Sequence, residues 1–416
     1  MTALDSYRDI LRHNRERRGG GVASICSAHP LVLRALFRSA LKRDTIALVE
    51  STSNQVDQFG GYTGMTPADF VDLVHALADA EGFPRDRLLL GGDHLGPNSW
   101  RAEGPGAAMA KTRDLVEAYV RAGYRKIHLD ASFVCAGDPA SLTDEIVAAR
   151  AAEMAEVAEA SWEGTPPVYI VGTEVPTPGG IVDAEEMHVT RPEDVRRTLA
   201  AFEAAFRARG LDAAWERVTG LVVQPGVEFG DGRVEDYAGA PELSKTILDY
   251  PGMVFEAHST DYQTPANLSR LVADHFCILK VGPWLTYALR EGLMALELIE
   301  RELAPDRPAR FREVLTGVMK DMPKYWAPYY SGDPSEVDFK LIYSYSDRAR
   351  YYLPQQQVKA AIDRLLANLA PVVPEALLSQ YLPAQYRAVR AGDLEPAPEA
   401  LLISRISEVI DVYLDA

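Results

Sequence analysis

A chain of 416 residues is long enough for one large α/β domain of about 250 residues or more with an appendage, or for two or three smaller domains. Its 47% hydrophobic and 25% charged residues are typical of a soluble globular protein with a sizeable core, and they exclude disorder of the whole chain. Lysine and arginine number 43 against 60 aspartates and glutamates, and the net charge of −17 disfavours nucleic acid and membrane surfaces as partners.

The N-terminal segment, residues 1–21, predicts a helix that leads into a glycine turn. Charges interrupt each of its apolar stretches, so it lacks the apolar centre of a secretory signal. No run of about 18 uninterrupted apolar residues occurs, and we expect no transmembrane helix. Three widely spaced cysteines in apolar runs indicate buried free thiols in a reducing cytoplasm, and they are Cys26, Cys135 and Cys277.

Short β-branched or apolar runs alternate with longer helical patterns from residue 22 to about residue 303. This alternation predicts a parallel sheet with helical crossovers, and eight consecutive units favour closure into an α/β fold of the (β/α)8 TIM-barrel type. The predicted strands are Val22–Ser27, Thr45–Ser51, Arg87–Gly92, Lys126–Ala131, Val168–Thr173, Val218–Gln224, Met253–His258 and Phe276–Val281.

An open doubly wound sheet is the rival fold. A dinucleotide-binding sheet would carry a Gly-x-Gly-x-x-Gly fingerprint after an early strand, and the first strand here ends Ser27-Ala28-His29-Pro30 instead. The glycine-rich lysine loop of P-loop kinases is also absent from the sequence. Both observations favour the barrel.

Helix start signals follow several strands. Threonines placed to cap a helix, each with a proline in the first turn, are Thr66, Thr190 and Thr264. From about residue 304 the alternation stops, and helical patterns are separated by Pro- and Tyr-rich loops. We therefore expect a barrel domain over residues 1–303 and a helical C-terminal extension packed on it over residues 304–416.

The strongest local signal is the segment 90–98, in which a strand runs into Asp93-His94 and then breaks. A neutral imidazole is a good ligand for a divalent cation, and a neighbouring carboxylate can move a proton beside the metal. Adjacent residues on a regular strand face opposite sides, so the chain must leave its pleat at Asp93 if both are to serve one site. A hydrogen-bonded structural pair is the alternative for Asp93 and His94.

A second histidine, His258, ends the seventh predicted strand. Glu174 and Gln224 end the fifth and sixth strands, so one rim of the barrel offers two imidazoles, a carboxylate and an amide oxygen. This set predicts a divalent metal site, with zinc expected and manganese, cobalt or nickel as alternatives. Glu174 is alternatively a general base or a partner of a sugar hydroxyl, and Gln224 a substrate ligand. His128, inside the fourth strand, is expected in the core or behind the site.

Other polar groups at strand ends suit a polyhydroxylated substrate. They are Ser51, Asn54 and Gln55 after the second strand, Asp130 after the fourth, Ser259 and Asp261 after the seventh, and Lys280 in the eighth. Lys280 predicts a phosphate contact or a Schiff base, or else a structural salt bridge.

Long segments resemble the GatZ/KbaZ family, among them residues 29–36, 50–70, 90–100, 171–180 and 254–263. The resemblance continues through residues 280–293 and the Tyr-rich tail. It implies a relationship to class II, metal-dependent fructose- and tagatose-bisphosphate aldolases with the (β/α)8 fold. Asp93-His94 resembles the Asp-His pair of those aldolases, which supplies a proton-transferring acid and a metal ligand. They use three histidine ligands, and Gln224 stands where one is expected.

The resemblance leaves several functions open. The first hypothesis is metal-dependent retro-aldol and aldol chemistry on a ketose or ketose phosphate of the tagatose or fructose type, as a 4-epimerase or aldolase, with Asp93 and Glu174 catalytic. The second is a non-catalytic subunit that stabilises a class II tagatose-1,6-bisphosphate aldolase. A tagatose-6-phosphate kinase and an aldolase acting through Lys280 are the third and fourth. A homo-oligomer is also expected.

Overall fold

The computed structural model describes residues 1–16, 19–173 and 188–416. Eight parallel strands close into a barrel in which neighbours in sequence are neighbours in space, so the predicted (β/α)8 architecture is confirmed. Each predicted strand is present within a few residues of its expected bounds. The barrel strands are β1 (Val22–Cys26), β2 (Ala47–Thr52), β3 (Leu88–Leu95), β4 (Lys126–Leu129), β5 (Val168–Val171), β6 (Val218–Val223), β9 (Val254–Ala257) and β10 (Ile278–Val281).

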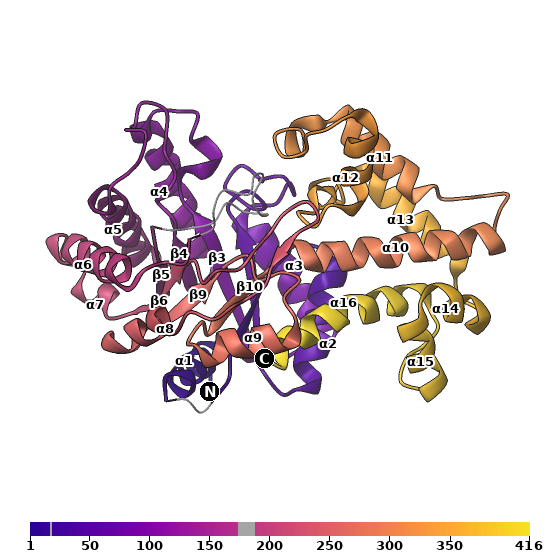
Figure 1. The fold of residues 1–416 in the computed structure, drawn as a ribbon, viewed down its shortest axis with the longest axis horizontal. Helices are drawn as coiled ribbons and strands as arrows, with labels where there is room; N and C mark the ends of the chain where they lie inside the picture. The colour runs from indigo at the N-terminus through magenta and orange to yellow at the C-terminus, as the bar shows by residue number, and fades with distance from the viewer. Residues whose placement is uncertain (17–18, 174–187) are drawn as a thin grey trace.

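Helices cover the outside of the barrel (Figure 1). They are α2 (Pro30–Lys42), α3 (Pro67–Ala80), α4 (Pro105–Ala122), α5 (Asp144–Ser161), α6 (Pro192–Ala208) and α9 (Pro265–Ala273), with the short α7 (Asp212–Trp215) and α8 (Pro241–Thr246). Thr66 and Thr264 cap α3 and α9 with their hydroxyls, as predicted. The prediction for Thr190 was wrong: Arg191 is the residue before α6, and the Thr190 hydroxyl accepts the backbone N–H of Gln224.

The first helix, α1 (Ala3–Arg15), closes the N-terminal end of the barrel. Its buried side chains share one apolar cluster with residues near the starts of the strands. Tyr7 is fully buried there, and its hydroxyl lies 3.2 Å from Thr219 Oγ1 on β6. This end of the barrel is therefore packed like a protein core.

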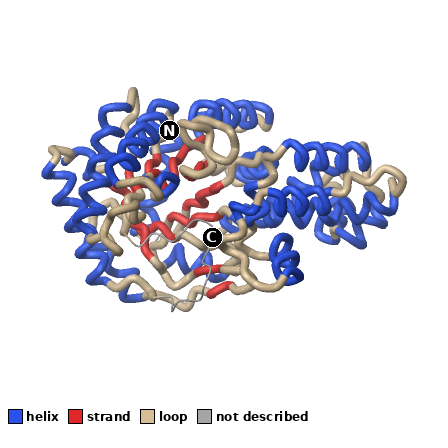
Figure 2. The backbone as a smooth tube through the Cα atoms, turned by 90° about the horizontal axis from the view of Figure 1, so that it is seen from above, coloured by secondary structure: helices blue, strands red, loops and turns tan. Residues whose placement is uncertain are grey.

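The last strand is followed by a long helix, α10 (Pro283–Leu303), that leaves the barrel (Figures 1 and 2). Around it lie α11 (Phe311–Asp321), α12 (Pro334–Tyr343), α13 (Gln356–Leu369), α14 (Glu375–Tyr381) and α15 (Pro383–Ala391). The final helix, α16 (Pro398–Leu414), returns and packs against α2, α10 and β1. The domain boundary after residue 303 stays a prediction, and α16 lies in the layer of helices around the barrel.

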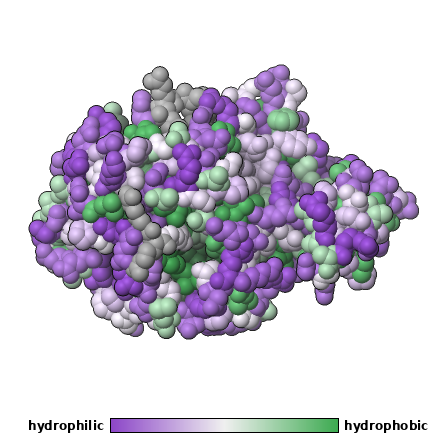
Figure 3. Space-filling view, turned by 60° about the horizontal axis from the view of Figure 1, so that its bottom comes forward, coloured by the Kyte–Doolittle hydropathy of each residue, from purple (hydrophilic) through white to green (hydrophobic). Residues whose placement is uncertain are grey.

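Small elements complete the fold. A hairpin of β7 (Glu228–Phe229) and β8 (Val234–Glu235) follows β6 and was not predicted. The 3-10 turns are η1 (Arg85–Arg87), η2 (Pro97–Trp100), η3 (Ile247–Asp249), η4 (Pro323–Tyr325) and η5 (Arg348–Tyr351). All three cysteines are buried and free, as expected. Within the described residues no helix is long and apolar enough to cross a membrane. The face drawn in Figure 3 is mostly hydrophilic, with small scattered hydrophobic patches.

Candidate metal centre and its cavity

A cavity of about 520 Å³ opens at the C-terminal ends of the barrel strands. Ends of β1, β2, β3, β9 and β10 contribute to its walls, together with η5 of the C-terminal extension. Its lining includes Cys26, Thr52, Asn54, Gln55, Tyr62, Asp93, His94, Phe229, His258, Ser259, Asp261, Lys280, Arg350 and Tyr351. The predicted location of the site at this rim therefore coincides with a cavity.

The backbone of β3 is irregular where Asp93 and His94 enter this cavity. Pairing of β3 with β4 changes register between Gly92 and Leu95, and His94 has a left-handed φ of 47°. That conformation is unfavourable for a residue with a side chain and occurs mainly where the surrounding structure enforces it. Because the chain leaves the regular pleat here, both side chains line the same cavity.

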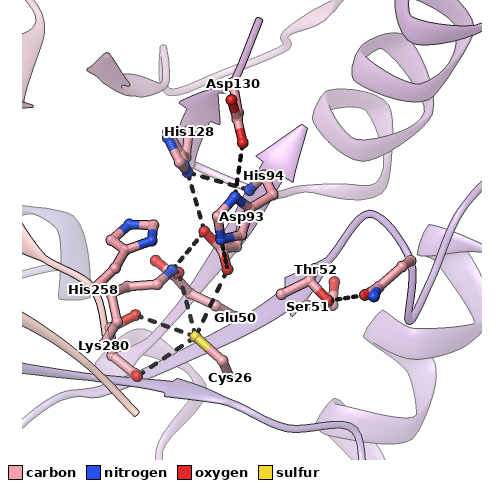
Figure 4. Close-up of polar contacts among 12 residues, drawn as sticks. Cys26, Glu50, Ser51, Thr52, Asp93, His94, His128, Asp130, His258 and Lys280 are labelled. Carbon is pink, nitrogen blue, oxygen red and sulfur yellow. Dashed lines mark hydrogen bonds and ion pairs between the residues drawn. The ribbon is translucent and has the colours of Figure 1, made fainter. Parts of the chain in front are cut away.

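Three imidazoles meet at the mouth of the barrel (Figure 4). The ring centre of His94 lies 5.2 Å from that of His128 and 4.9 Å from that of His258, and the last two are 5.3 Å apart. His94 comes from β3, His128 from β4, and His258 directly follows β9. We call these three residues the imidazole cluster. Side chains far apart in sequence thus converge as the barrel hypothesis required.

Carboxylates orient each ring of the imidazole cluster. Asp130 Oδ2 lies 2.7 Å from His94 Nδ1, and Glu256 Oε1 lies 2.9 Å from His258 Nε2. Asp93 Oδ1 lies 3.1 Å from His128 Nδ1. Histidines that bind metals commonly donate their second ring N–H to a carboxylate in this way.

The donor set fits a divalent cation. Ligand atoms of Asp93, His128, Glu256 and His258 lie within 4.8 Å of one another, and the His94 ring stands beside both of the other imidazoles. Metal–nitrogen bonds of about 2.0–2.1 Å in a tetrahedral site hold ring centres about 5 Å apart, close to the observed spacing. In addition, His128 Nε2 is buried without a hydrogen-bond partner, as expected for a nitrogen reserved for a ligand.

A buried network of opposite charges lies in the barrel next to the imidazole cluster. Lys126 Nζ lies 2.6 Å from both Glu50 Oε1 and Glu256 Oε2, and all three residues are fully buried. Lys280 pairs with Glu50, and its Nζ lies 2.7 Å from Asp93 Oδ1. Glycine at position 91 permits this packing, because a Cβ there would lie 2.6 Å from Glu50 Cγ.

This network fixes the protonation of the groups at the mouth. Burial would raise the pKa of Asp93, but His94 and Lys280 outweigh it and hold the pKa well below its usual range. Burial would lower the pKa of Lys280, yet Asp93, Cys26 and Glu50 raise it well above the ordinary value. Burial lowers the pKa of His258 to about 4 and leaves it a neutral imidazole. Lys280 is therefore an ammonium group, poorly suited to attack a carbonyl.

Asn54, Gln55, Ser259, Asp261 and Lys280 line the cavity, as sequence reasoning expected of substrate-binding residues. Ser51, Asp130 and Gln224 were also expected in the site, but their side chains lie outside the cavity lining. Ser51 points to the tyrosines of α4 and the loop after it, with its Oγ 3.1 Å from Tyr119 Oη and 3.0 Å from Tyr124 Oη. Asp130 faces His94 instead of the cavity.

Gln224 does not line the cavity, because its side-chain oxygen accepts the backbone N–H groups of Gly226 at 2.8 Å and Val227 at 3.1 Å. The expected role of Gln224 as a metal ligand is thus replaced by turn stabilisation. Glu174, expected as a catalytic residue and a metal ligand, lies outside the described residues.

His128 was expected in the core or behind the site, and the structure buries it fully outside the cavity lining, beside the rings of His94 and His258. Lys126, His128 and Asp130 alternate on the inward face of β4 and its continuation, and this alternation is the signal that could have placed the His128 ring with the other two.

Sequence reasoning missed the two residues of the cavity lining that the extension contributes. Arg350 and Tyr351 come from a Tyr-rich loop of the extension and carry no motif that marks them.

Residues 7–416 match the family described as D-tagatose-1,6-bisphosphate aldolase subunit GatZ/KbaZ-like. The chain belongs to this family. The GatZ/KbaZ-like chain is also similar to a solved structure described as a probable tagatose 6 phosphate kinase from Sinorhizobium meliloti 1021. The two share 47% sequence identity over 95% of this chain and 99% of the other, with a TM-score of 0.88.

A fructose-bisphosphate aldolase from Campylobacter jejuni shares the fold at 14% identity. The match covers 92% of this chain and 98% of the aldolase, with a TM-score of 0.51. Family membership and fold together establish an aldolase-related protein.

Proposed function

We propose that this GatZ/KbaZ-like protein carries out metal-dependent retro-aldol and aldol chemistry on a ketose or ketose phosphate of the tagatose or fructose type. The observation that carries the proposal is the imidazole cluster at the barrel mouth, with the Asp93 carboxylate beside it. Cleavage between C3 and C4 followed by release of the fragments is an aldolase reaction. Rotation of the aldehyde fragment before recombination inverts C4 and gives a 4-epimerase.

The metal would be held by His94, His128 and His258, with zinc the expected ion and manganese, cobalt or nickel the alternatives. His128 takes the place in this set that Gln224 held in the sequence-based hypothesis. A bound divalent ion supplies charge that polarises the C2 carbonyl and an adjoining hydroxyl of the ketose. Asp130 and Glu256 keep the His94 and His258 rings in position.

Asp93 is the group we assign to proton transfer. Its Oδ2 lies 3.7 Å from His94 Nε2, and Lys280 and His128 fix its other oxygen. The ionised carboxylate is positioned at the cavity to take a proton from a substrate hydroxyl and return it, and because its pKa is held low it is a weak base that needs an acidified hydroxyl. Asn54 and Ser259 offer polar groups to the remaining hydroxyls. Glu174 stays a predicted second catalytic residue.

The test is metal analysis of the purified protein together with turnover of tagatose, fructose and their phosphates. We expect about one divalent ion per chain, turnover that a chelator abolishes, and recovery after the metal is restored. Sugar analysis by NMR separates epimers from cleavage fragments. The proposal is contradicted if the purified protein contains no metal and its turnover is unchanged by the chelator.

A second candidate role is that of a subunit without turnover of its own, because the matching family is described as an aldolase subunit. Co-expression with a class II tagatose-1,6-bisphosphate aldolase tests it. The subunit role predicts no turnover by the GatZ/KbaZ-like chain alone and a higher melting temperature or activity of the partner. The similar Sinorhizobium protein is described as a probable tagatose 6 phosphate kinase. Incubation of the chain with ATP and tagatose 6-phosphate tests whether it has that kinase activity. Homo-oligomerisation and a cytoplasmic location stay predictions.

A further inference from the structure

The C-terminal extension contributes an arginine to the cavity that holds His94 and His258. Arg350 and Tyr351 belong to η5 and line this cavity. The turn before them is fixed by buried contacts: Asp347 accepts Thr286 Oγ1 at 2.6 Å and Arg290 Nε at 3.0 Å. Arg350 therefore sits at the barrel mouth on a rigid support.

Arg350 lacks a carboxylate partner in the described part of the chain. No carboxylate oxygen of those residues lies within 4.0 Å of its guanidinium. Its Nε is buried without a hydrogen-bond partner, and its Nη2 donates to Tyr351 Oη at 3.2 Å. A largely buried charge that is left unpaired costs free energy, and an anionic ligand that pairs with it would offset that cost.

The other cation of the cavity is in the opposite situation. Lys280 forms ion pairs with Glu50 and Asp93, so its positive charge is already balanced by carboxylates inside the barrel. Asp261 also lines the cavity, but its Oδ1 accepts the backbone N–H groups of Gly282 and Trp284 at the start of α10. Of the lysine and arginine side chains in the described lining of this cavity, Arg350 is therefore the one whose charge is left for a ligand.

We propose that Arg350 binds an anionic group of the substrate, a phosphate or a carboxylate, and makes the cavity selective for a charged ketose over a neutral one. The planar guanidinium matches both groups through paired N–H donors. The selectivity rests on the proposed function, whereas binding of the anion is measurable without turnover.

The experiment compares the whole native chain with Arg350→Met and Arg350→Lys by calorimetry. The probes are inorganic phosphate, tagatose 6-phosphate, tagaturonate and tagatose. We expect Arg350→Met to bind the anionic sugars about 10- to 100-fold more weakly and tagatose within about 2-fold of native. Arg350→Lys keeps the positive charge but loses the paired N–H donors, so its affinity for the anionic sugars should lie between those of the native chain and Arg350→Met. Should Arg350→Met fail to fold, Arg350→Lys carries the same comparison.

A matched control is Lys359→Gln. Lys359 lines an adjoining cavity of about 1400 Å³ that shares Arg350 with the first one but has no residue of the imidazole cluster in its wall. Its loss should leave all affinities within about 2-fold, since charges outside the contact contribute little. An equal effect of Lys359→Gln and Arg350→Met overturns the assignment to Arg350.

Two further outcomes overturn the inference: native protein that binds neither charged sugar, and an Arg350→Met variant that loses tagatose and tagatose 6-phosphate equally. Preference of the native chain for tagatose 6-phosphate or for tagaturonate identifies phosphate or carboxylate. Failure of the proposed function looks different. In that case metal and turnover are absent while anion binding still depends on Arg350. Equal kcat/KM of the native enzyme for tagatose and tagatose 6-phosphate keeps the function and removes the inference.

Discussion

The two ends of the barrel are filled with different kinds of residue, although the same eight strands supply both. At the N-terminal end, valine, leucine and isoleucine side chains pack against α1 around Tyr7. At the C-terminal end, Glu50, Lys126, Glu256 and Lys280 are buried with the imidazole cluster. Barrel enzymes place stability at the first end and chemistry at the second. The comparison predicts that substitutions at the two ends should separate into losses of stability and losses of function.

The largest functional effect is expected for His258→Ala. Removal of this imidazole should abolish stoichiometric metal binding and lower activity by more than about 100-fold. Loss of a residue that only supports a metal ligand costs up to about 100-fold, and loss of the ligand itself should cost more. Stability should change little, because the ring lies at a cavity. Metal analysis and turnover measure the effect, with His75→Ala on the outer helix α3 as the control. Native metal content in His258→Ala contradicts the proposed ligand set.

Lys126→Met tests an exception to this separation. Lys126 lies with the residues of the functional end, but its substitution should lower the free energy of unfolding. The substitution leaves Glu50 and Glu256 with reduced compensation in a buried site. Breaking a buried ion pair costs about 3–5 kcal/mol of unfolding free energy. Urea denaturation measures it. The control, Lys245→Met at an exposed position of α8, should cost less than about 1 kcal/mol. A small loss for Lys126→Met would show that the network is not a stabilising unit.

Asp130→Asn tests the support of the metal site. Asp130 holds the His94 ring by a 2.7 Å contact and does not line the cavity. Loss of its charge should lower metal affinity or activity about 10- to 100-fold. If Asp130 bound substrate directly, as first expected, the substitution would raise KM and leave metal affinity unchanged. Metal titration followed by steady-state kinetics separates the two roles.

Tyr7→Phe samples the opposite end of the barrel. The change removes one buried hydroxyl that lies 3.2 Å from Thr219 Oγ1 and keeps the ring packed. We expect a loss of about 1 kcal/mol in unfolding free energy, with metal content and activity unchanged below the melting temperature. A loss of activity without a loss of stability would mean that the two ends are not independent.

The sequence was sufficient for the fold because the eight strand patterns are local and regular. It also brought His94 and His258 to one cavity, since both stand where a strand ends, and their role as metal ligands stays a prediction. It was insufficient for Gln224, whose amide oxygen serves its own turn. Arg350 was out of reach for another reason: its position depends on how an extension of several helices folds back over the barrel.

The orientation of side chains along a strand was the remaining difficulty, and Ser51 illustrates it. On β2, Glu50 enters the barrel and Thr52 lines the cavity, so the alternation of a strand turns Ser51 outward to Tyr119 and Tyr124. Ser51 was predicted in the site because it is a polar residue at the end of the second predicted strand, but the alternation of side chains along β2 turns it away from the cavity.

Ser51→Ala is therefore expected to have the smallest effect. It removes hydrogen bonds between β2 and two buried tyrosines and should lower the unfolding free energy by about 1 kcal/mol. KM and kcat should stay at native values, because the hydroxyl does not reach the cavity. Thr52→Ala, one residue along, is the matched comparison: its side chain lines the cavity and bonds Asn54 at 2.5 Å, so KM should rise. The reverse pattern, with KM raised by Ser51→Ala alone, would mean that β2 presents its other face to the substrate.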